Sequence, residues 1–302
     1  MIISAVIVTY NPKIELLVQQ FKSLDSQLNN IIYVDNSSQN ILSFESEILA
    51  IPTSVNIYFI KNSVNLGLGK AHNLGITKAE ELNSDFVLIL DHDSVLKPTF
   101  LSELLNGFFQ LEEQKIPVGA VGPVYIDNIT KEVYPITRYS GPFIKRTYPV
   151  SEPVEASVLI SSGCLIALST IKQVGYMNEE LFIDYVDIEW SYRCRYFGYK
   201  LYAIPTAIME HQVGDKRVSI LGRMISVHTP LRRYYLSRNS IYMLRCPYIS
   251  WGYKFRELTF NVLRILIFSL ISNQKIKYLK CSFLGLYDGL RGHYGKCSII
   301  KK

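Results

Sequence analysis

The sequence predicts an α/β protein with a mostly parallel central sheet flanked by helices, followed by a helical C-terminal extension. Two observations lead to this fold class. Short apolar runs alternate with segments of helical periodicity over much of the N-terminal half, as in strand–helix–strand units. The run over residues 86–90 is continuously apolar, as in strands buried on both faces of a parallel sheet. We place the main domain at residues 1–245 and the extension at residues 246–302.

The composition suits one large core and an anionic partner. The chain has 302 residues, of which 48% are hydrophobic, and this argues against disorder. Thirty-two Lys and Arg stand against 26 Asp and Glu, which gives a net charge of +6. A nucleotide, a lipid pyrophosphate or a membrane surface would suit this modest excess. The sequence lacks a Lys/Arg-rich block, so we expect no nucleic-acid partner.

Cysteine usage and the N-terminus predict a cytoplasmic protein. The five cysteines are scattered and none forms a Cys-x-x-Cys pair, so neither a disulfide framework nor a thiolate zinc site is predicted. The apolar run at residues 2–8 has no positively charged start and is interpreted as a strand instead of a signal peptide. No apolar run reaches the roughly 18 residues that a spanning helix needs.

The first two strands end in polar residues. Residues 2–8 form the first strand, and Tyr10-Asn11-Pro12 ends it where a phosphate or a base can approach the backbone. Helical spacing of apolar residues over 14–24 predicts an amphipathic helix that covers the sheet. The next strand, at 31–34, is followed at once by Asp35. Both strands deliver polar groups to their carboxyl ends, where open α/β sheets bind ligands.

A glycine-rich turn follows the third strand, at residues 55–60. Gly67 and Gly69 precede a helical pattern, which predicts a tight turn onto a helix N-terminus with Lys70 as a point charge for phosphate. The turn is not a Walker loop, because the Lys-Ser/Thr pair of that motif is missing. By itself it is a weak signal.

The strand at 86–90 ends in Asp91 and Asp93, two carboxylates one residue apart. Mg²⁺ or Mn²⁺ is usually held beside a nucleotide by a few protein oxygens together with phosphate oxygens. Asp91 and Asp93 are therefore candidate metal ligands. The alternative is a solvated turn, in which Asp and Ser are ordinary residues.

The central part of the chain continues the alternation. Residues 118–123 predict a further buried strand, and residues 125–155 predict an aperiodic excursion over the site. A strand at 158–160 leads to the small residues 161–164, which let a ligand approach the backbone, and then to 165–168.

A second acidic cluster lies among aromatic residues at 182–190 and contains Asp184, Asp187 and Glu189. We expect a helix here, on which Asp184 and Asp187 are neighbours. The cluster predicts a general base in apolar surroundings. The alternative is the ordinary preference of a helix N-terminus for negative charge.

Two polar features and one apolar stretch complete the chain. His211 follows the strand-like residues 201–208 and is either a metal ligand or a packed capping residue. A later helix brings together Arg232, Tyr235, Arg238 and Asn239. Arginine forks suit pyrophosphate, and a basic solvated face is the alternative. The apolar and aromatic stretch 255–276 with interspersed cations is typical of an interfacial amphipathic helix, or of a helix packed on the core.

Five motifs occur in a fixed order along the chain: Thr9-Tyr10-Asn11-Pro12, Asp35-Asn36-Ser37, Asn65-x-Gly-x-Gly with Ala71 and Asn73, Asp91-His92-Asp93, and Asp184-Tyr185-Val186-Asp187-Ile188-Glu189-Trp190. Together they resemble family 2 inverting glycosyltransferases of the GT-A fold. The chain looks most like the bacterial rhamnosyltransferases of O-antigen and capsule assembly, through residues 182–190 and the string from Arg232 to Asn239. The resemblance covers residues 1–245.

The resemblance implies where the donor and the metal bind. The residues implied to contact the donor are Thr9, Asn11 and Asp35 at the base and ribose, Asn65 and Lys70 near the nucleotide, and Asp91 near the ribose or metal. Tyr10, Arg232 and Arg238 are further donor-binding candidates. The metal, Mg²⁺ or Mn²⁺, is assigned to Asp93 with Asp91, and His211 is a third candidate ligand.

The resemblance also implies a catalytic base. Asp187 matches that base, although many relatives carry Glu-Asp where this chain has Val186-Asp187. Because the acidic neighbour is missing, Asp184 and Glu189 stand as substitutes. The base deprotonates an acceptor hydroxyl for in-line attack on the anomeric carbon, and the metal and basic groups neutralise the leaving nucleoside diphosphate.

The expected function is transfer of rhamnose from dTDP-rhamnose, with inversion, to a lipid-linked saccharide of O-antigen or capsule polysaccharide at the inner face of the cytoplasmic membrane. The alternatives are another UDP or dTDP sugar as donor, or a non-catalytic nucleotide-sugar-binding subunit. A sugar-1-phosphate nucleotidyltransferase would want an N-terminal glycine-rich loop, and residues 9–12 contain no glycine.

Overall fold

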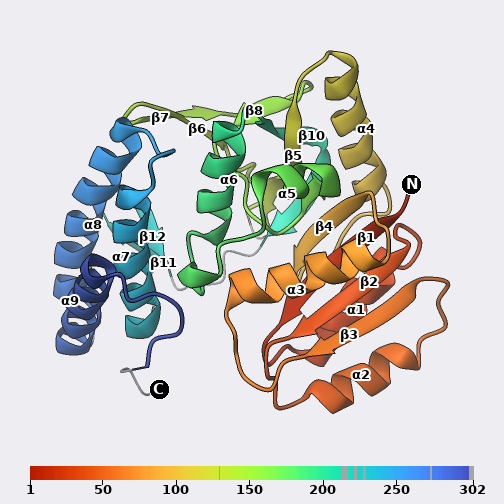
Figure 1. Cartoon of the computed structure of the whole chain (residues 1–302), viewed down its shortest axis with the longest axis horizontal. Coiled ribbons are helices and arrows are strands. Elements are labelled where there is room, and N and C mark those ends of the chain that lie inside the picture. The colour runs from red at the N-terminus through yellow and green to blue at the C-terminus, as the bar shows by residue number, and fades with distance from the viewer. Residues whose placement is uncertain (129, 212–216, 221–222, 227–228, 273, 299–302) are drawn as a thin grey trace.

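A mixed eight-stranded sheet forms the centre of the molecule (Figure 1). The computed structural model describes the chain except for residues 129, 212–216, 221–222, 227–228, 273 and 299–302. Within the described residues the strand order is β3-β2-β1-β4-β9-β5-β10-β8. The predicted α/β fold with flanking helices is confirmed.

The N-terminal half alternates strands and helices, as predicted. Its strands run parallel to their sheet neighbours in this half and are β1 (Ile3–Thr9), β2 (Asn30–Asp35), β3 (Asn56–Lys61) and β4 (Phe86–Asp91). The helices between them are α1 (Ile14–Leu24), α2 (Ile41–Leu49), α3 (Leu68–Glu81) and, after β4, α4 (Phe100–Glu113).

The second half completes the sheet and adds a hairpin. Its sheet strands are β5 (Val118–Asp127), β8 (Val154–Ala156), β9 (Cys164–Ala167) and β10 (Lys200–His211). β9 lies antiparallel between β4 and β5, and β10 pairs parallel with β5. The hairpin is β6 (Ile136–Ser140) with β7 (Phe143–Thr147), and the helices are α5 (Leu168–Val174), the 3₁₀ turn η1 (Glu179–Leu181) and α6 (Val186–Tyr196).

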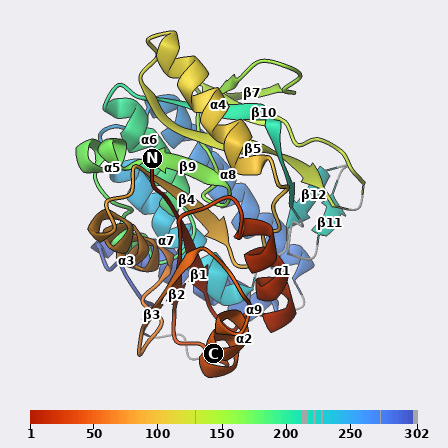
Figure 2. The same ribbon diagram turned by 90° about the vertical axis from the view of Figure 1, so that its right-hand side faces the viewer.

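Both faces of the sheet are buried, because alternate strand residues enter two different cores. In β1, Ala5 and Ile7 join a core with residues of α1, α2 and α4, whereas Val6 joins a core with residues of α3, α5 and α6. Figure 2 shows α1 and α3 on opposite sides of strands β1, β2 and β3. This double burial explains the continuous apolar runs in the sequence.

Two predictions for the central part need correction. Residues 158–160 form no strand; the backbone N–H of Leu159 donates instead to the Ser191 hydroxyl, 3.3 Å away. The predicted excursion over 125–155 contains the β6–β7 hairpin, whose Tyr139 ring packs edge-on against Tyr253 of the C-terminal extension. The hairpin thus contacts the extension.

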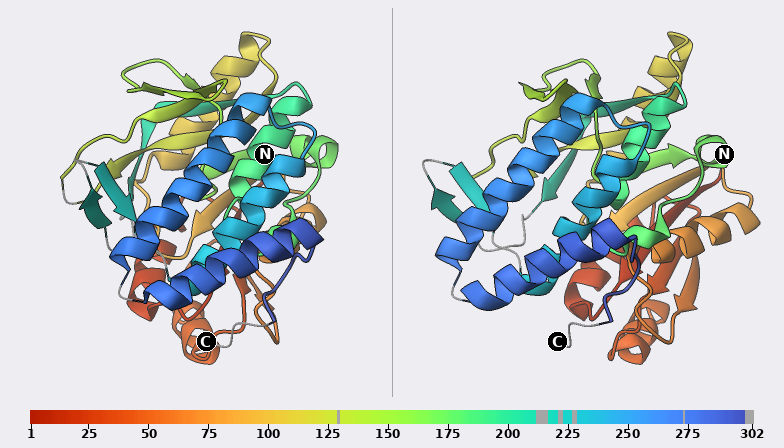
Figure 3. Two further views of the ribbon diagram at one scale, coloured as in Figure 1. Left: turned by 90° about the vertical axis from the view of Figure 1, so that its left-hand side faces the viewer. Right: turned by 60° about the vertical axis from the view of Figure 1, so that its left-hand side comes forward.

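The C-terminal part packs as a group of three helices beside the sheet (Figure 3). A two-stranded sheet of β11 (Arg217–Ile220) and β12 (Arg223–Ser226) precedes these helices. The helices are α7 (Pro230–Arg245), α8 (Trp251–Ile271) and α9 (Lys275–Arg291). α9 approaches α7 closely because Gly285 has no side chain: a Cβ there would lie 2.3 Å from the Tyr234 carbonyl oxygen. The boundary at residue 245 stays a prediction.

None of the helices among the described residues is long and apolar enough to cross a membrane.

Candidate active site

The carboxyl ends of β1, β2 and β4 meet at one edge of the sheet. Thr9 is in register with Asp35, and Val8 with Asp91. The Thr9 hydroxyl donates to Asp35 Oδ1 at 2.9 Å, and the backbone N–H of Ser38 donates to Asp35 Oδ2 at 2.8 Å. The buried Asp35 carboxylate is therefore held in one orientation at the position where the sequence predicts the donor's base.

Side-chain amides join the loops around this edge. The Asn11 side chain accepts a hydrogen bond from the backbone N–H of Gln39 (2.9 Å), and the Asn11 backbone N–H donates to the Ser38 hydroxyl (2.7 Å). Asn36 donates to the Gly67 carbonyl at 3.1 Å, and Asn65 accepts from the Gly67 N–H at 2.9 Å. The first, second and third strand ends thus form one connected rim.

The glycine-rich turn leads onto the N-terminus of α3 as predicted, and it also makes room for protein backbone. A Cβ on Gly67 would lie 2.6 Å from the Phe182 carbonyl oxygen, and one on Gly69 would lie 2.6 Å from that of Asn178. The Leu68 N–H at the start of α3 donates to the Phe182 carbonyl at 2.5 Å. The start of α3 therefore serves as the contact with the segment that precedes α6.

Lys70, predicted to lie near the nucleotide, forms an ion pair with Glu179 at 3.0 Å. Both side chains are about two-fifths exposed, so the ammonium is accessible from solvent. Tyr10, which is also exposed, directly follows β1. The nucleotide contacts of both residues stay predictions.

A serine loop joins the predicted metal ligands to the predicted base. The Asp91 N–H donates to the Ser162 hydroxyl at 3.0 Å, and the Ser162 carbonyl accepts from the Tyr125 hydroxyl at 2.5 Å. Burial raises the pKa of Tyr125 well above its usual value, and the charges of Asp91 and Asp187 raise it further. The charges of two carboxylates from distant parts of the sequence thus both act on one buried hydroxyl.

Asp187, the predicted base, lies in the first turn of α6. Its carboxylate accepts the Ile188 N–H at 2.8 Å. Burial raises the pKa of Asp187 to about 6, the negative charge of Asp184 adds to that rise, and backbone hydrogen bonds from Ile188 and Ser161 oppose it. A carboxylate with this pKa accepts protons near neutral pH.

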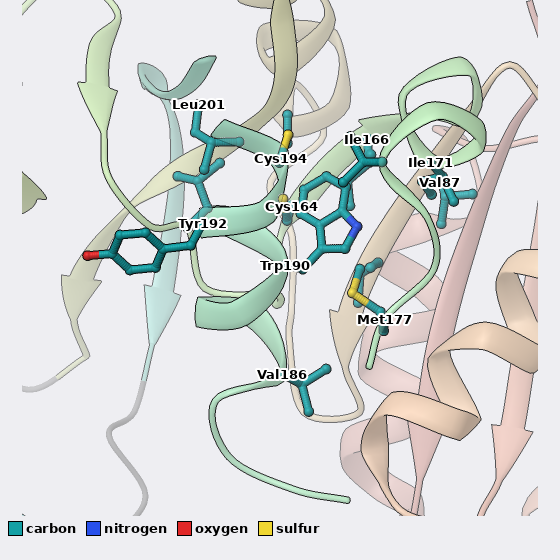
Figure 4. Packing of buried hydrophobic residues seen from close by; sticks show 14 of the residues in the cluster. Val87, Cys164, Ile166, Ile171, Met177, Val186, Trp190, Tyr192, Cys194 and Leu201 are labelled. Atoms are coloured by element: carbon teal, nitrogen blue, oxygen red, sulfur yellow. The ribbon is translucent and has the colours of Figure 1, made fainter. Parts of the chain in front are cut away.

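The core side of α6 fixes this helix. Val186, Trp190 and Cys194 point into a packed cluster with Cys164 and Ile166 of β9 (Figure 4). Asp187, the predicted base, is therefore carried by a helix that is anchored in the core.

Asp184 is not on the same helix as Asp187, contrary to prediction, because α6 begins at Val186. Asp184 has a left-handed backbone with φ of 60°. Its carboxylate accepts hydrogen bonds from the Arg232 guanidinium at 3.0 and 3.1 Å. Arg232, predicted to bind the donor, thus already contacts an acidic residue close to the base.

Glu189 is paired within the protein, which corrects its prediction as a substitute base. Its carboxylate is 1% exposed and pairs with Arg193 at 2.8 Å, and it also accepts a hydrogen bond from Tyr248. The contact with Tyr248 joins α6 to the segment between α7 and α8. Arg193 and Tyr248 together compensate the buried charge of Glu189.

Arg238 of α7 is buried, and its side chain binds backbone carbonyls of the protein. This corrects its predicted role in binding pyrophosphate. Its guanidinium donates to the carbonyl oxygens of Leu181 (2.9 Å), Glu180 (3.1 Å) and Gly295. It also stacks 4.9 Å from the centre of the Tyr235 ring. The helix predicted to contain Arg232 and Arg238 is confirmed as α7. The Arg238 side chain, however, does not lie on a solvated basic face but is buried against backbone carbonyls.

Asn239, beside it, holds the segment that leads to the base. Its amide lies 2.9 Å from the Leu181 carbonyl, 2.8 Å from that of Ile183 and 3.1 Å from that of Asp184. In this segment three non-glycine residues have positive φ: Phe182, Asp184 and Tyr185. Such backbone persists where surrounding contacts over-determine it. We call Arg238 and Asn239 with the carbonyls of residues 180–184 the backbone clamp.

The metal site would be formed by Asp91 and Asp93. Asp91 is half-buried at the end of β4, and Asp93 is exposed. Two carboxylates at a strand end fit a hard cation that takes its other ligands from a diphosphate. Among the described residues, no three His, Cys, Asp or Glu side chains lie together as a complete metal site. The His211 side chain lies outside the part of the chain that the structure describes.

The comparisons with known proteins agree with this geometry. Residues 4–166 match the family described as Glycosyl transferase family 2. The chain belongs to this family and is a glycosyltransferase. It is 34% identical over 296 residues to "dTDP-rhamnosyl transferase RfbF" of Shigella flexneri, with 97% of each chain covered. It is 23% identical to "Low-salt glycan biosynthesis hexosyltransferase Agl10" of Haloferax volcanii, over 97% of this chain and 92% of the relative.

Solved structures show the same fold. The crystal structure of GalNAc-T7 with UDP, GalNAc and Mn²⁺ matches with a TM-score of 0.59 at 16% identity, over 90% of this chain and 58% of that one. The crystal structure of Staphylococcus aureus TarS residues 1–349 matches with a TM-score of 0.56 at 15% identity, over 97% of this chain and 83% of that one. The GT-A prediction for this glycosyltransferase is confirmed.

Some contributors to the site are not predictable from the sequence. Ser162 and Tyr125 appear there only within the small residues 161–164 and the aperiodic segment 125–155, and Asn36 only as part of a motif. Each acts through contacts across the sheet, which no local pattern signals. The small residues at 161–163 are the one visible hint.

The backbone clamp predicts a kinetic effect at a distance from the substrate. Asn239→Ala should lower kcat by about 10²-fold, because a small displacement of the base is enough for such a loss. The donor KM should change little, since the strand-end rim is untouched. Steady-state kinetics measures both values.

Asn261→Ala is the matched control. Asn261 is also a buried, hydrogen-bonded asparagine of the helical part, but its partners are Arg233 and Ser240. It should destabilise the protein by a similar amount and leave kcat nearly unchanged. Equal kcat values in the two variants would show that the clamp does not position the base.

Proposed function

We propose that this glycosyltransferase moves rhamnose from dTDP-rhamnose, with inversion, to a hydroxyl of a lipid-linked saccharide in O-antigen or capsule polysaccharide synthesis, at the inner face of the cytoplasmic membrane. The observation that carries the donor is the 34% identity to a dTDP-rhamnosyl transferase over 97% of both chains. The relative is matched over nearly its whole length, helical extension included, and this supports a shared donor more strongly than the fold does.

Donor binding is assigned to the strand-end rim. Thr9, Asn11 and Asp35 would contact the base and ribose. Asp91 and Asp93 would hold Mg²⁺ or Mn²⁺, which when bound neutralises the diphosphate and makes it a better leaving group. The structure of GalNAc-T7 with UDP, GalNAc and Mn²⁺ supports a divalent ion in this fold.

Asp187 is assigned the role of base. Its carboxylate takes the proton of the acceptor hydroxyl as the oxygen attacks the anomeric carbon. The new glycosidic C–O bond forms while the C–O bond to the diphosphate breaks, and dTDP leaves with the electron pair from the face opposite to the attack. One displacement of this kind inverts the anomeric configuration.

A donor screen tests the proposal. Purified protein is incubated with a lipid-linked saccharide acceptor and, separately, dTDP-rhamnose, UDP-GlcNAc and UDP-glucose, and nucleoside diphosphate release is measured. We expect acceptor-dependent release from dTDP-rhamnose above all. Release from a UDP sugar with none from dTDP-rhamnose would overturn the donor assignment.

Asp93→Asn tests the assigned metal ligand. We expect it to abolish the dependence of dTDP binding on Mn²⁺ or Mg²⁺, since one of two carboxylate ligands is lost. Titration calorimetry with and without metal measures this. Asp85→Asn, at the other end of β4, is the control and should bind as the native protein does. Native metal-dependent affinity in Asp93→Asn would remove Asp93 from the site.

Asp187→Asn tests the base. A positioned base contributes about 10²–10⁴-fold, so transfer should fall by that factor while dTDP binding is kept. In the native enzyme the rate should fall as the pH drops through about 6, because the raised pKa of Asp187 leaves the carboxylate protonated below that value. Near-native transfer in this variant, with collapse in Asp184→Asn, would move the role to Asp184.

A further inference from the structure

The charge of the chain is concentrated in its C-terminal extension. Residues 246–302 contain ten Lys and Arg but two acidic residues, whereas residues 1–245 contain 22 Lys and Arg and 24 acidic residues. Both carboxylates of the extension are buried: Glu257 accepts a hydrogen bond from Tyr185, and Asp288 from Tyr234 at 2.7 Å. The outer surface of the extension therefore carries cations without an exposed carboxylate of its own among the described residues.

The same helices expose large apolar side chains. On α8 they recur at helical spacing and include Trp251 (84% exposed), Phe255, Leu258, Val262 and Leu266. On α9 they are Ile276, Phe283, Tyr287 and Leu290. The opposite sides of the helices bury Tyr253, Phe268 and Tyr278. α8 thus has one apolar side packed on the protein and a second one facing outward, beyond what core packing requires.

The β6–β7 hairpin extends this surface. Its tip reaches the start of α8, where a Cβ on Gly252 would lie 2.3 Å from the Gly141 carbonyl carbon. Phe143 at the tip is 74% exposed, and Lys145 and Arg146 follow it. Figure 1 shows β7 beside one end of the helical group. An apolar surface bordered by cations therefore runs from the hairpin tip along α8 to α9.

We propose that the hairpin tip and the outer sides of α8 and α9 form one membrane-docking face for bilayers that contain anionic lipid. Interfacial binding needs exposed apolar area together with cations that meet acidic headgroups, and this face has both. A second copy of the chain fits worse, because it would bring two cationic surfaces together. The cations include the exposed Lys275, Lys277 and Lys280 of α9 and the half-buried Lys254 of α8.

The docking face also has a structural link to the active site. α9 packs on α7, and α7 carries the backbone clamp that holds the segment before Asp187. The docked face and the base are thus separated by one helix layer, an arrangement that suits an acceptor whose lipid stays in the bilayer. This link rests on the proposed function, whereas docking itself does not.

Vesicle sedimentation without substrate tests the docking face. The full chain is spun with vesicles of phosphatidylglycerol and phosphatidylcholine, or of phosphatidylcholine alone. We expect co-sedimentation with the anionic vesicles, with an affinity that falls by about tenfold or more at high salt. The double variants Trp251→Ser with Phe255→Ser, and Lys277→Glu with Lys280→Glu, should each lose affinity by a similar factor. Arg264 is left intact, because it pairs with the buried Glu257.

Matched variants outside the docking face are the controls. Leu42→Ser with Leu49→Ser removes two exposed leucines of α2, and Lys22→Glu with Lys172→Glu reverses two exposed charges. Both should sediment as the native chain does. Three results would each overturn the proposal. The controls could lose as much affinity as the test variants, or the native protein could stay in the supernatant at low salt. The third is a dimer in sedimentation velocity that dissociates when Trp251 and Phe255 are changed.

The outcome is separable from that of the donor screen. If the chain binds vesicles but releases no dTDP from dTDP-rhamnose, the docking proposal is supported and the donor proposal is wrong. If the chain transfers rhamnose but does not bind vesicles, only the docking proposal is wrong.

Discussion

The hydrogen bonds from Arg238 and Asn239 to the carbonyls of residues 180–184 are the constraint on which the active-site geometry depends. The segment they hold contains three non-glycine residues with positive φ and ends where α6 and Asp187 begin. Backbone of this kind costs of order 1–3 kcal/mol per residue and needs support from outside the segment. The support comes from α7, so a helix that follows the sheet in the sequence helps to form the site.

The other half of the site depends on the sheet. Parallel strands β1, β2 and β4 end at the same edge, and the serine loop before β9 connects that edge to Asp187. One part of the molecule therefore presents the rim assigned to the donor, and the other presents Asp187, to which the role of base is assigned.

The sequence predicts well what depends on local periodicity and strand ends, and less well what depends on packing across the chain. It places Asp35 and Asp91 correctly at strand ends, because apolar runs mark parallel strands. It predicts phosphate contacts for the Gly67 turn and for Arg238, but both meet the segment around residues 178–182, and only the tertiary fold reveals that partner. Ser162 carries no pattern of its own, since its role arises from two long-range hydrogen bonds.

The central claim is that one base-assisted displacement transfers rhamnose from its nucleotide. Nuclear magnetic resonance of the saccharide formed from dTDP-rhamnose tests it most directly, because the coupling constants and chemical shifts of the new linkage report its anomeric configuration. The account predicts the configuration opposite to that of the donor. A product with the donor's configuration would contradict both the single displacement and the role of Asp187 as its base.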